Sequence, residues 1–177
     1  MQARLFLDCD GVLADFEAAA TALLGMPSRV FEARYGASTF WRRLAKADNF
    51  YGELPLMLDA RVLHEAVAHL DPTILTGCPR GGWAEAQKES WARRNFPGVP
   101  IITCMAVNKR AHCQPGDVLI DDTLKHRHLW EEARGVFIHH RSAAESLAAL
   151  ASAWPTANIL HGNVTSHVLR STIRQST

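Results

Sequence analysis

The sequence has few cysteines, no long apolar run and no excess of charge of one sign. Its 177 residues include only four cysteines, and none lies in a C-x-x-C pair, which excludes a disulfide framework. No apolar run is long enough to cross a bilayer. Lys and Arg total 19 against 18 for Asp and Glu, so the basic field of a duplex-binding domain is missing. We therefore expect neither a nucleic-acid polymer nor a membrane as a partner.

The composition is that of an ordinary globular domain. Hydrophobic residues make up 47% and charged residues 21%, which excludes disordered, collagen-like and coiled-coil classes. The segment Met1–Asp8 has too short an apolar stretch for a signal peptide, so we expect a cytoplasmic protein. The near-neutral charge and the aromatic content permit a homodimer without requiring one.

Short apolar runs alternate with helical patterns along most of the chain. Runs bounded by polar residues or glycine predict five buried strands, at 4–7, 73–75, 100–103, 118–120 and 135–138. Apolar residues at helical spacing predict helices over 60–70, 83–95, 124–133 and 142–153, with Ser142 capping the last. This alternation predicts an α/β fold, with a Rossmann-like open parallel sheet and right-handed crossovers.

The alternation stops between Asp15 and Leu58, where we expect no strand. An apolar, Ala-rich helical stretch begins at Phe16, Gly25 breaks it, and a second helical stretch starts at Arg29. We therefore predict an α/β core over 1–15 and 59–153, a helical cap over 16–58 and a C-terminal extension over 154–177. The extension could form a strand, a helix or a tail. The aromatic residues of the cap either form its own small core or line a pocket above the sheet edge.

Acidic, hydroxyl and cationic residues follow the predicted strands at their carboxyl ends. These are Asp8 and Asp10 after the first run, Thr76 after the second, Lys109 after the third, and Asp121 and Asp122 after the fourth. Ligands of open parallel sheets bind outside these strand ends, so we expect the side chains to converge. Four neighbouring acids repel one another unless a divalent cation offsets them, and hard oxygen ligands suit Mg²⁺. Together with the lysine and the threonine, such a cation predicts a phosphate site.

Each of these residues has an ordinary explanation when it is taken alone. The string D-x-D-G also opens a calcium loop, but Val12 and Ala19 stand where that loop needs oxygen ligands. Asp121-Asp122 fits a solvated turn or a helix cap, and Lys109 fits a surface charge. Their order along the chain and their common position at strand ends favour a functional site.

The same motifs, in the same order, resemble those of the haloacid-dehalogenase-like phosphohydrolases. In this sequence, Leu7–Phe16 resembles the family's first motif and Ile74-Leu75-Thr76-Gly77 its second. The segment around Lys109 resembles the third motif, and Leu119-Ile120-Asp121-Asp122 the fourth. Within that superfamily the sequence most resembles the 5′(3′)-deoxyribonucleotidases. The resemblance rests on D-G-V-L-A-D-F at 10–16, the helical insertion after it, Phe50-Tyr51 followed by Leu54-Pro55, and L-I-D-D. The sequence departs from that family at Thr76-Gly77-Cys78-Pro79, where the family usually has Thr-Ser-Pro, and in the tail after Trp154.

The resemblance implies a Mg²⁺-dependent phosphomonoesterase that acts on a small phosphate ester, a nucleoside monophosphate. Asp8 would be the nucleophile that forms an aspartyl-phosphate, and Asp10 would protonate the leaving oxygen and then activate water. Mg²⁺ would be held by Asp8, the backbone carbonyl of Asp10 and a fourth-motif acid. For that acid we favour Asp122, with Asp121 in support, although the two could exchange roles.

The resemblance also assigns the substrate contacts. Thr76 and Lys109, with Gly11 and Gly77 beside them, would bind the phosphoryl group. The cap aromatics would surround the base, at Phe16, Trp41, Phe50 and Tyr51.

Two other functions stay open at this stage. The same chemistry could act on another small phosphate ester, such as a sugar phosphate. Alternatively, the chain could be a non-catalytic binding module that keeps the fold. All four acids are present, at Asp8, Asp10, Asp121 and Asp122, which argues against the second of these.

Overall fold

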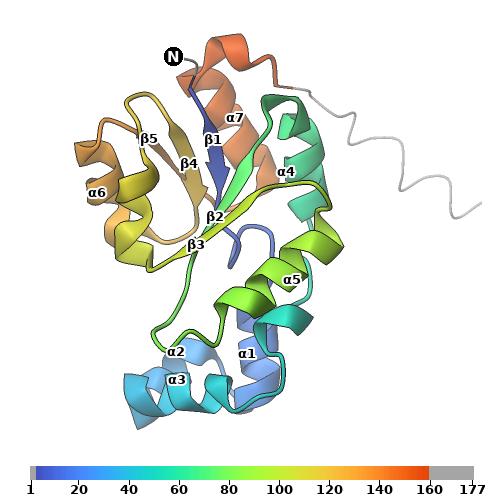
Figure 1. The fold of residues 1–177 in the computed structure, drawn as a ribbon, viewed down its shortest axis with the longest axis vertical. Coiled ribbons are helices and arrows are strands. Elements are labelled where there is room, and N and C mark those ends of the chain that lie inside the picture. Colours follow the sequence, from blue (N-terminus) through green and yellow to red (C-terminus); the bar gives the residue numbers. More distant parts are fainter. Residues whose placement is uncertain (1–2, 160–177) are drawn as a thin grey trace, which may run out of the picture.

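The computed structural model describes residues 3–159, and its centre is a five-stranded sheet. Every strand pairing is parallel, and the strand order is β3-β2-β1-β4-β5 (Figure 1). The strands are β1 (Leu5–Leu7), β2 (Thr73–Gly77), β3 (Ile101–Cys104), β4 (Val118–Asp121) and β5 (Val136–His139). The predicted α/β fold with an open parallel sheet is confirmed. The predicted C-terminal extension falls mostly outside the described residues, which include only a 3₁₀ turn, η5, at Pro155–Ala157.

Helices cover both faces of the sheet, as they must in a parallel sheet that is buried on both sides. One face packs against α4 (Ala60–Val67), α5 (Glu85–Asn95) and α7 (Ala143–Ala153), and a short turn, η2 (Ala68–Leu70), follows α4. The other face packs against α6 (Arg127–Glu132) and the turn η3 (Ala106–His112), and a second turn, η4 (Leu124–His126), contacts α6 (Figure 1). Successive strand residues point to opposite faces, so Leu5 and Leu7 join the first core and Phe6 joins the second.

Most helices begin and end where the sequence indicates. Ser142 caps α7, because its Oγ accepts a hydrogen bond from the Glu145 N–H at 3.2 Å. The segment predicted as one helix over 124–133 is instead a 3₁₀ turn followed by the short α6. His140, which follows β5, is buried at 4% exposure, and its Nδ1 lies 2.8 Å from Ser146 Oγ on α7.

Three helices follow β1 and lie together beyond the end of the sheet (Figure 1). They are α1 (Phe16–Leu24), α2 (Ser28–Tyr35) and α3 (Ala37–Ala45), and the 3₁₀ turn η1 (Tyr51–Glu53) leads back to α4. Asp15 caps α1 by accepting a hydrogen bond from the Ala18 N–H at 2.9 Å, and Gly25 ends it in a left-handed conformation. From here on, the cap means residues 16–54 of the predicted cap segment 16–58, which hold these three helices and η1.

The chain enters and leaves the cap along two adjacent segments. The Asp15 N–H donates to the Pro55 carbonyl at 2.8 Å, and the Met57 N–H donates to the Leu13 carbonyl at 2.9 Å. The cap is therefore fixed to the sheet directly after the loop that carries Asp8 and Asp10. Among the described residues, none of the helices has the length and apolarity that crossing a bilayer requires.

Candidate active site

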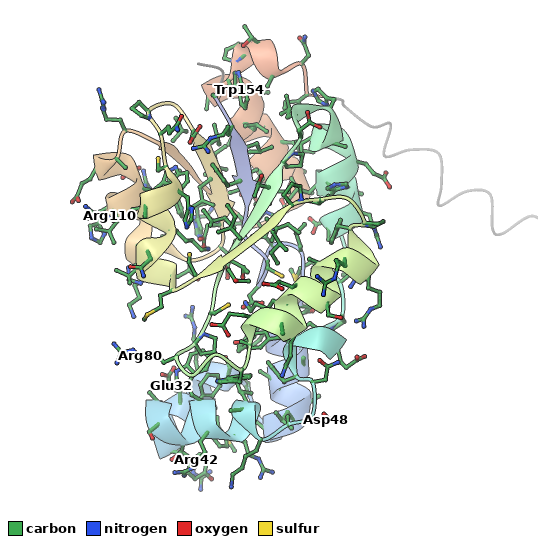
Figure 2. All side chains as sticks on the ribbon, in the orientation of Figure 1. Glu32, Arg42, Asp48, Arg80, Arg110 and Trp154 are labelled. Atoms are coloured by element: carbon green, nitrogen blue, oxygen red, sulfur yellow. The ribbon has the colours of Figure 1, made fainter. Side chains whose placement is uncertain are left out.

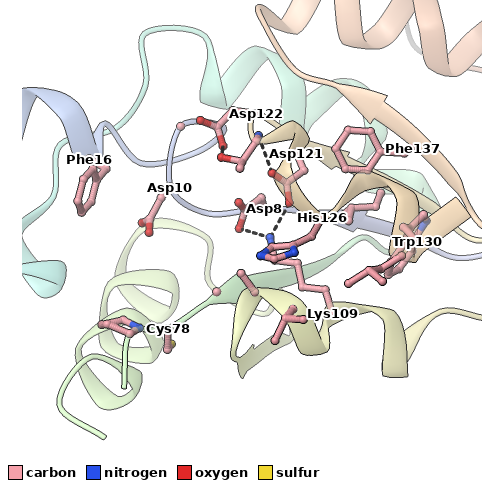
Figure 3. Close-up of a pocket in the computed structure, with 18 of the residues that line it drawn as sticks. Asp8, Asp10, Phe16, Cys78, Lys109, Asp121, Asp122, His126, Trp130 and Phe137 are labelled. Carbon is pink, nitrogen blue, oxygen red and sulfur yellow. Dashed lines mark hydrogen bonds and ion pairs between the residues drawn. The ribbon is translucent and has the colours of Figure 1, made fainter. Parts of the chain in front are cut away.

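A cavity of about 410 Å³ opens at the carboxyl ends of the central strands. The acids predicted from the sequence lie in its middle, with Phe16 at one end and Phe137 and Trp130 at the other (Figure 3). Of the predicted site residues, the lining includes Asp8, Asp10, Gly11, Phe16, Trp41, Tyr51, Gly77, Lys109, Asp121 and Asp122. Topology brings Asp8, Gly77 and Asp121 together, because β1 lies between β2 and β4.

The loop after β1 turns tightly around the carbonyl of Cys9. That carbonyl accepts hydrogen bonds from the N–H groups of Val12, Leu13 and Ala14. Gly11 adopts a positive φ of 75° in this turn, and a Cβ at that position would overlap the carboxylate of Asp122. Gly11 is therefore required both for the turn and for the close approach of the fourth-motif acid.

Lys109 joins two of the acids. Its Nζ lies 2.9 Å from Asp8 Oδ1 and 2.7 Å from Asp121 Oδ2, and its side chain is 8% exposed (Figure 3). Burial opposes its charged form, but the carboxylates of Asp8 and Asp121 prevail and raise the pKa of Lys109, which keeps the ammonium protonated. Lys109 lies on the 3₁₀ turn η3, which follows β3.

Carboxylate oxygens of Asp8, Asp121 and Asp122 lie within 4.8 Å of one another. Burial, reinforced by the charge of Asp8, raises the pKa of Asp121 to about 6 and that of Asp122 to about 7. Burial and the mutual repulsion of the three acids therefore both oppose their charged forms. A hard divalent cation would relieve this repulsion, so the donor set fits Mg²⁺.

The two fourth-motif acids differ in their hydrogen bonds. Both oxygens of Asp121 are used, because Oδ1 accepts from the Thr123 N–H at 2.8 Å and Oδ2 accepts from Lys109. Asp122 accepts only a 3.2 Å bond from the Thr123 hydroxyl, at Oδ1, among residues 3–159. Asp122 therefore has a carboxylate oxygen free for a metal, which agrees with the preference for it as the direct ligand.

Asp10 pairs with a lysine that sequence reasoning missed. Lys88 comes from α5, is 1% exposed, and its Nζ lies 2.6 Å from Asp10 Oδ2. Burial raises the pKa of Asp10, and the charge of Lys88 opposes that effect. Burial also disfavours the charge on Lys88, yet Asp10 above all raises its pKa.

Thr76 lies behind the cavity wall rather than on it. The structure buries Thr76 completely, and its Oγ1 accepts a 2.9 Å hydrogen bond from Lys88. Its neighbours Gly77, Cys78 and Pro79 line the cavity instead. Thr76 therefore does not face the cavity, which argues against the predicted direct contact between Thr76 and a phosphoryl group.

The cap aromatics divide into a core and a cavity wall. Phe50 is 6% exposed, does not line the cavity, and packs edge-on against Phe16 with ring centroids 5.6 Å apart. Phe50 therefore does not line the substrate pocket as predicted, because it belongs to the small core of the cap with Phe40. Phe16, Tyr51 and the 38%-exposed Trp41 line the cavity.

The cap also contributes polar residues that no sequence pattern marked. Glu17, Ser28 and Arg29 line the cavity, and the Glu17 carboxylate accepts from both the N–H and the hydroxyl of Ser28. Cys78 and Pro79, on the loop after β2, line the same cavity as these cap residues, and Figure 2 labels Arg80 on that loop.

Comparison with solved structures finds three hydrolases that are similar to this chain. A haloacid-dehalogenase-like family hydrolase from Streptococcus pneumoniae matches 82% of this chain and 90% of its own, with a TM-score of 0.50 and 13% identity. A hydrolase from Pseudomonas syringae matches 86% of this chain and 90% of its own, with a TM-score of 0.49 and 14% identity. A hydrolase from Streptococcus pneumoniae TIGR4 matches 85% of this chain and 99% of its own, with a TM-score of 0.49 and 13% identity.

No protein-family model matches the sequence, and no curated protein sequence matches it. The chain has the fold of the haloacid-dehalogenase-like hydrolases. At this identity the likeness concerns the fold, so any statement about chemistry must come from the site residues themselves.

Proposed function

We propose that this protein is a phosphomonoesterase that works through an aspartyl-phosphate on Asp8. The observation that carries the proposal is the pairing of Lys109 with both Asp8 and Asp121 inside the cavity. This pairing supports the proposal because it would give the reaction a nucleophilic carboxylate, a cation for phosphoryl oxygens and metal-binding acids within one small volume. Phosphoryl transfer needs mainly this combination of positioning and charge.

Asp8 has one oxygen held by the protein and one left free. Oδ1 accepts from Lys109 and, at 2.7 Å, from the Cys9 N–H, whereas Oδ2 has no hydrogen-bond partner among residues 3–159. Oδ2 is therefore the oxygen that remains open to a ligand in the cavity. Lys109 uses two of its three N–H donors on Asp8 and Asp121, and the third is available for a phosphoryl oxygen.

Asp10 is suited to proton transfer. It lines the same cavity, two residues from Asp8, and its side chain remains 26% exposed. When the P–O bond to the leaving group breaks, its electron pair stays on the leaving oxygen, and the Asp10 carboxyl supplies the proton. The resulting carboxylate then takes a proton from the water that attacks the aspartyl-phosphate, which frees Asp8 and phosphate.

Asp8, Asp122 and the backbone carbonyl of Asp10 are the groups that would hold Mg²⁺, with Asp121 in support. The Asp10 carbonyl accepts no hydrogen bond from the described residues. When bound, Mg²⁺ would supply the positive charge that offsets the clustered acids and the phosphoryl oxygens.

The substrate we favour is a nucleoside monophosphate. Phe16 and Trp41 give the cavity an aromatic wall on the cap side, and a nucleobase stacks on such a wall with little sequence preference. A sugar phosphate is the alternative, because Glu17 and Ser28 offer hydrogen-bonding groups on the same side.

The test is phosphate release from a panel of nucleoside and sugar monophosphates, with Mg²⁺ and with EDTA. We expect metal-dependent release and higher kcat/KM for the nucleotides. Release from sugar phosphates alone would replace the substrate class and keep the chemistry. No release from any of them would contradict the proposed function.

A further inference from the structure

Lys88 is a buried cation that the mechanism above does not use. It lies on α5 with 1% of its surface exposed, and it is not among the residues that line the cavity. Its ammonium group nevertheless reaches Asp10, which does line the cavity. A buried lysine is costly unless it is fully paired, so this contact requires an explanation.

All three N–H donors of Lys88 have partners. They are Asp10 Oδ2 at 2.6 Å, Thr76 Oγ1 at 2.9 Å and the Gly77 carbonyl at 2.9 Å. The ring of Tyr51 covers the same ammonium, with its centroid 4.4 Å from Nζ. Lys88 therefore has no donor left for a phosphoryl oxygen, which distinguishes it from Lys109.

The Asp10 carboxyl depends on this one contact. Among residues 3–159, Lys88 is the only side chain that hydrogen-bonds to it, and Asp10 Oδ1 is buried without a partner. Thr76 and Gly77 belong to β2, so the two other bonds of Lys88 tie the carboxyl to a central strand of the sheet. Lys88 and β2 thereby fix the position of Asp10 relative to Asp8, although neither belongs to the loop after β1 that carries both acids.

We propose that Lys88 is a positioning residue that holds the Asp10 carboxyl where it transfers a proton to the leaving oxygen. This inference rests on the proposed function. Lys88 acts through Asp10 and does not touch the substrate. Its removal should therefore impair reactions that need protonation of the leaving group, and spare reactions that do not.

The experiment compares two substrates in the variant Lys88→Met. A nucleoside 5′-monophosphate releases an alkoxide-type oxygen that must be protonated, whereas 4-nitrophenyl phosphate releases a phenolate that needs no proton. We expect kcat/KM for the nucleotide to fall about a hundredfold, the effect of misplacing a catalytic group by about 1 Å. We expect kcat/KM for the aryl phosphate to fall less than about threefold, and inhibition by inorganic phosphate to stay unchanged.

Gln87→Met is the matched control. Gln87 precedes Lys88 on α5 and accepts a 2.9 Å hydrogen bond from the Tyr51 N–H, so its loss disturbs the same helix and the same aromatic residue. It does not line the cavity, and we expect equal, small effects on both substrates. An equal loss for both substrates in Lys88→Met, or weaker inhibition by phosphate, would overturn the positioning role.

Lys88→Met could fail to fold because Asp10 loses its partner. In that case a double variant still tests the proposal. Asp10→Asn combined with Lys88→Met removes both charges, and it should have nearly the kcat/KM of Asp10→Asn alone because the two residues act as one unit. A further loss of tenfold or more would overturn the proposal. Wild-type protein that releases phosphate from neither substrate would instead overturn the proposed phosphomonoesterase itself.

Discussion

Lys109 Nζ lies 2.9 Å from Asp8 Oδ1, at a position where both side chains are about nine-tenths buried. The same ammonium is 2.7 Å from Asp121 Oδ2, so one cation offsets two carboxylates that face one another across β1 and β4. A buried network of this kind is sensitive to the loss of one member, because the remaining charges then have no partner.

Replacing Lys109 should therefore destabilise the fold as well as impair activity. We expect Lys109→Met to lower the free energy of unfolding by about 3–5 kcal/mol at pH 8 in EDTA. Urea denaturation measures this loss, with the exposed Lys125→Met as the control, for which we expect a change within about 0.5 kcal/mol. Equal effects of the two substitutions would show that the Lys109 network contributes nothing to stability.

Stabilisation by Mg²⁺ should increase with pH. The pKa of Asp121 is raised to about 6 and that of Asp122 to about 7, so the metal-free folded state holds protons more tightly than the unfolded chain. Its stability therefore falls as the pH rises from about 4 through 7, and Mg²⁺ replaces the lost protons. We expect the Tm difference between Mg²⁺ and EDTA to be larger at pH 8 than at pH 5.5. A difference that is constant with pH would argue that these acids do not bind the metal.

Gly11 and Gly25 share one backbone conformation, so alanine substitutions at the two positions distinguish the cost of backbone strain from the effect of a contact with Asp122. Gly11 has a φ of 75° and Gly25 a φ of 74°, but a Cβ at Gly25 meets nothing within 4 Å, whereas one at Gly11 overlaps Asp122. Alanine at either position should cost about 1–2 kcal/mol. Only Gly11→Ala should also raise the Mg²⁺ concentration needed for half-maximal activity. If Gly25→Ala raises it equally, the contact with Asp122 is not the cause.

The aromatic wall of the cavity predicts an effect on kcat/KM for nucleotides. Trp41 and Tyr35 are both exposed cap aromatics, at 38% and 45%, but only Trp41 lines the cavity. Trp41→Ala should lower kcat/KM for nucleotides about 5- to 150-fold, the loss of one stacking contact of ~1–3 kcal/mol. We expect Tyr35→Ala to leave it unchanged. Identical kinetics for the two variants would favour a substrate without a base.

The central part of the site follows from the sequence because strand ends determine it. Asp8 and Asp121 end or follow adjacent parallel strands, and the motif strings around them are local, so sheet order alone places them side by side. Lys109 follows β3, two strands away from β1, and only its long side chain brings the charge back to the centre. The predicted runs agree with the strands to within one or two residues at each end, and the runs of β1 and β4 are buried on both faces.

The rest depends on packing between distant segments. Lys88 shares the buried stripe of α5 with Ala84, Trp91 and Ala92, at intervals of four, seven and eight residues from Ala84. A lysine on such a stripe is a sequence signal, but nothing local indicates that its partner is Asp10, 78 residues away. Similarly, no pattern distinguishes Phe50, which fills the core of the cap, from Trp41, which lines the cavity.

The most direct test of the account is to look for the phosphoenzyme on Asp8. Wild-type protein is mixed with substrate and Mg²⁺, quenched in acid within one turnover, and analysed by intact mass and peptide mapping. The account predicts a mass gain of one phosphoryl group on the peptide that contains Asp8, and no gain and no phosphate release in Asp8→Asn. Phosphate release that persists in Asp8→Asn, or a phosphoryl group on another residue, would contradict it.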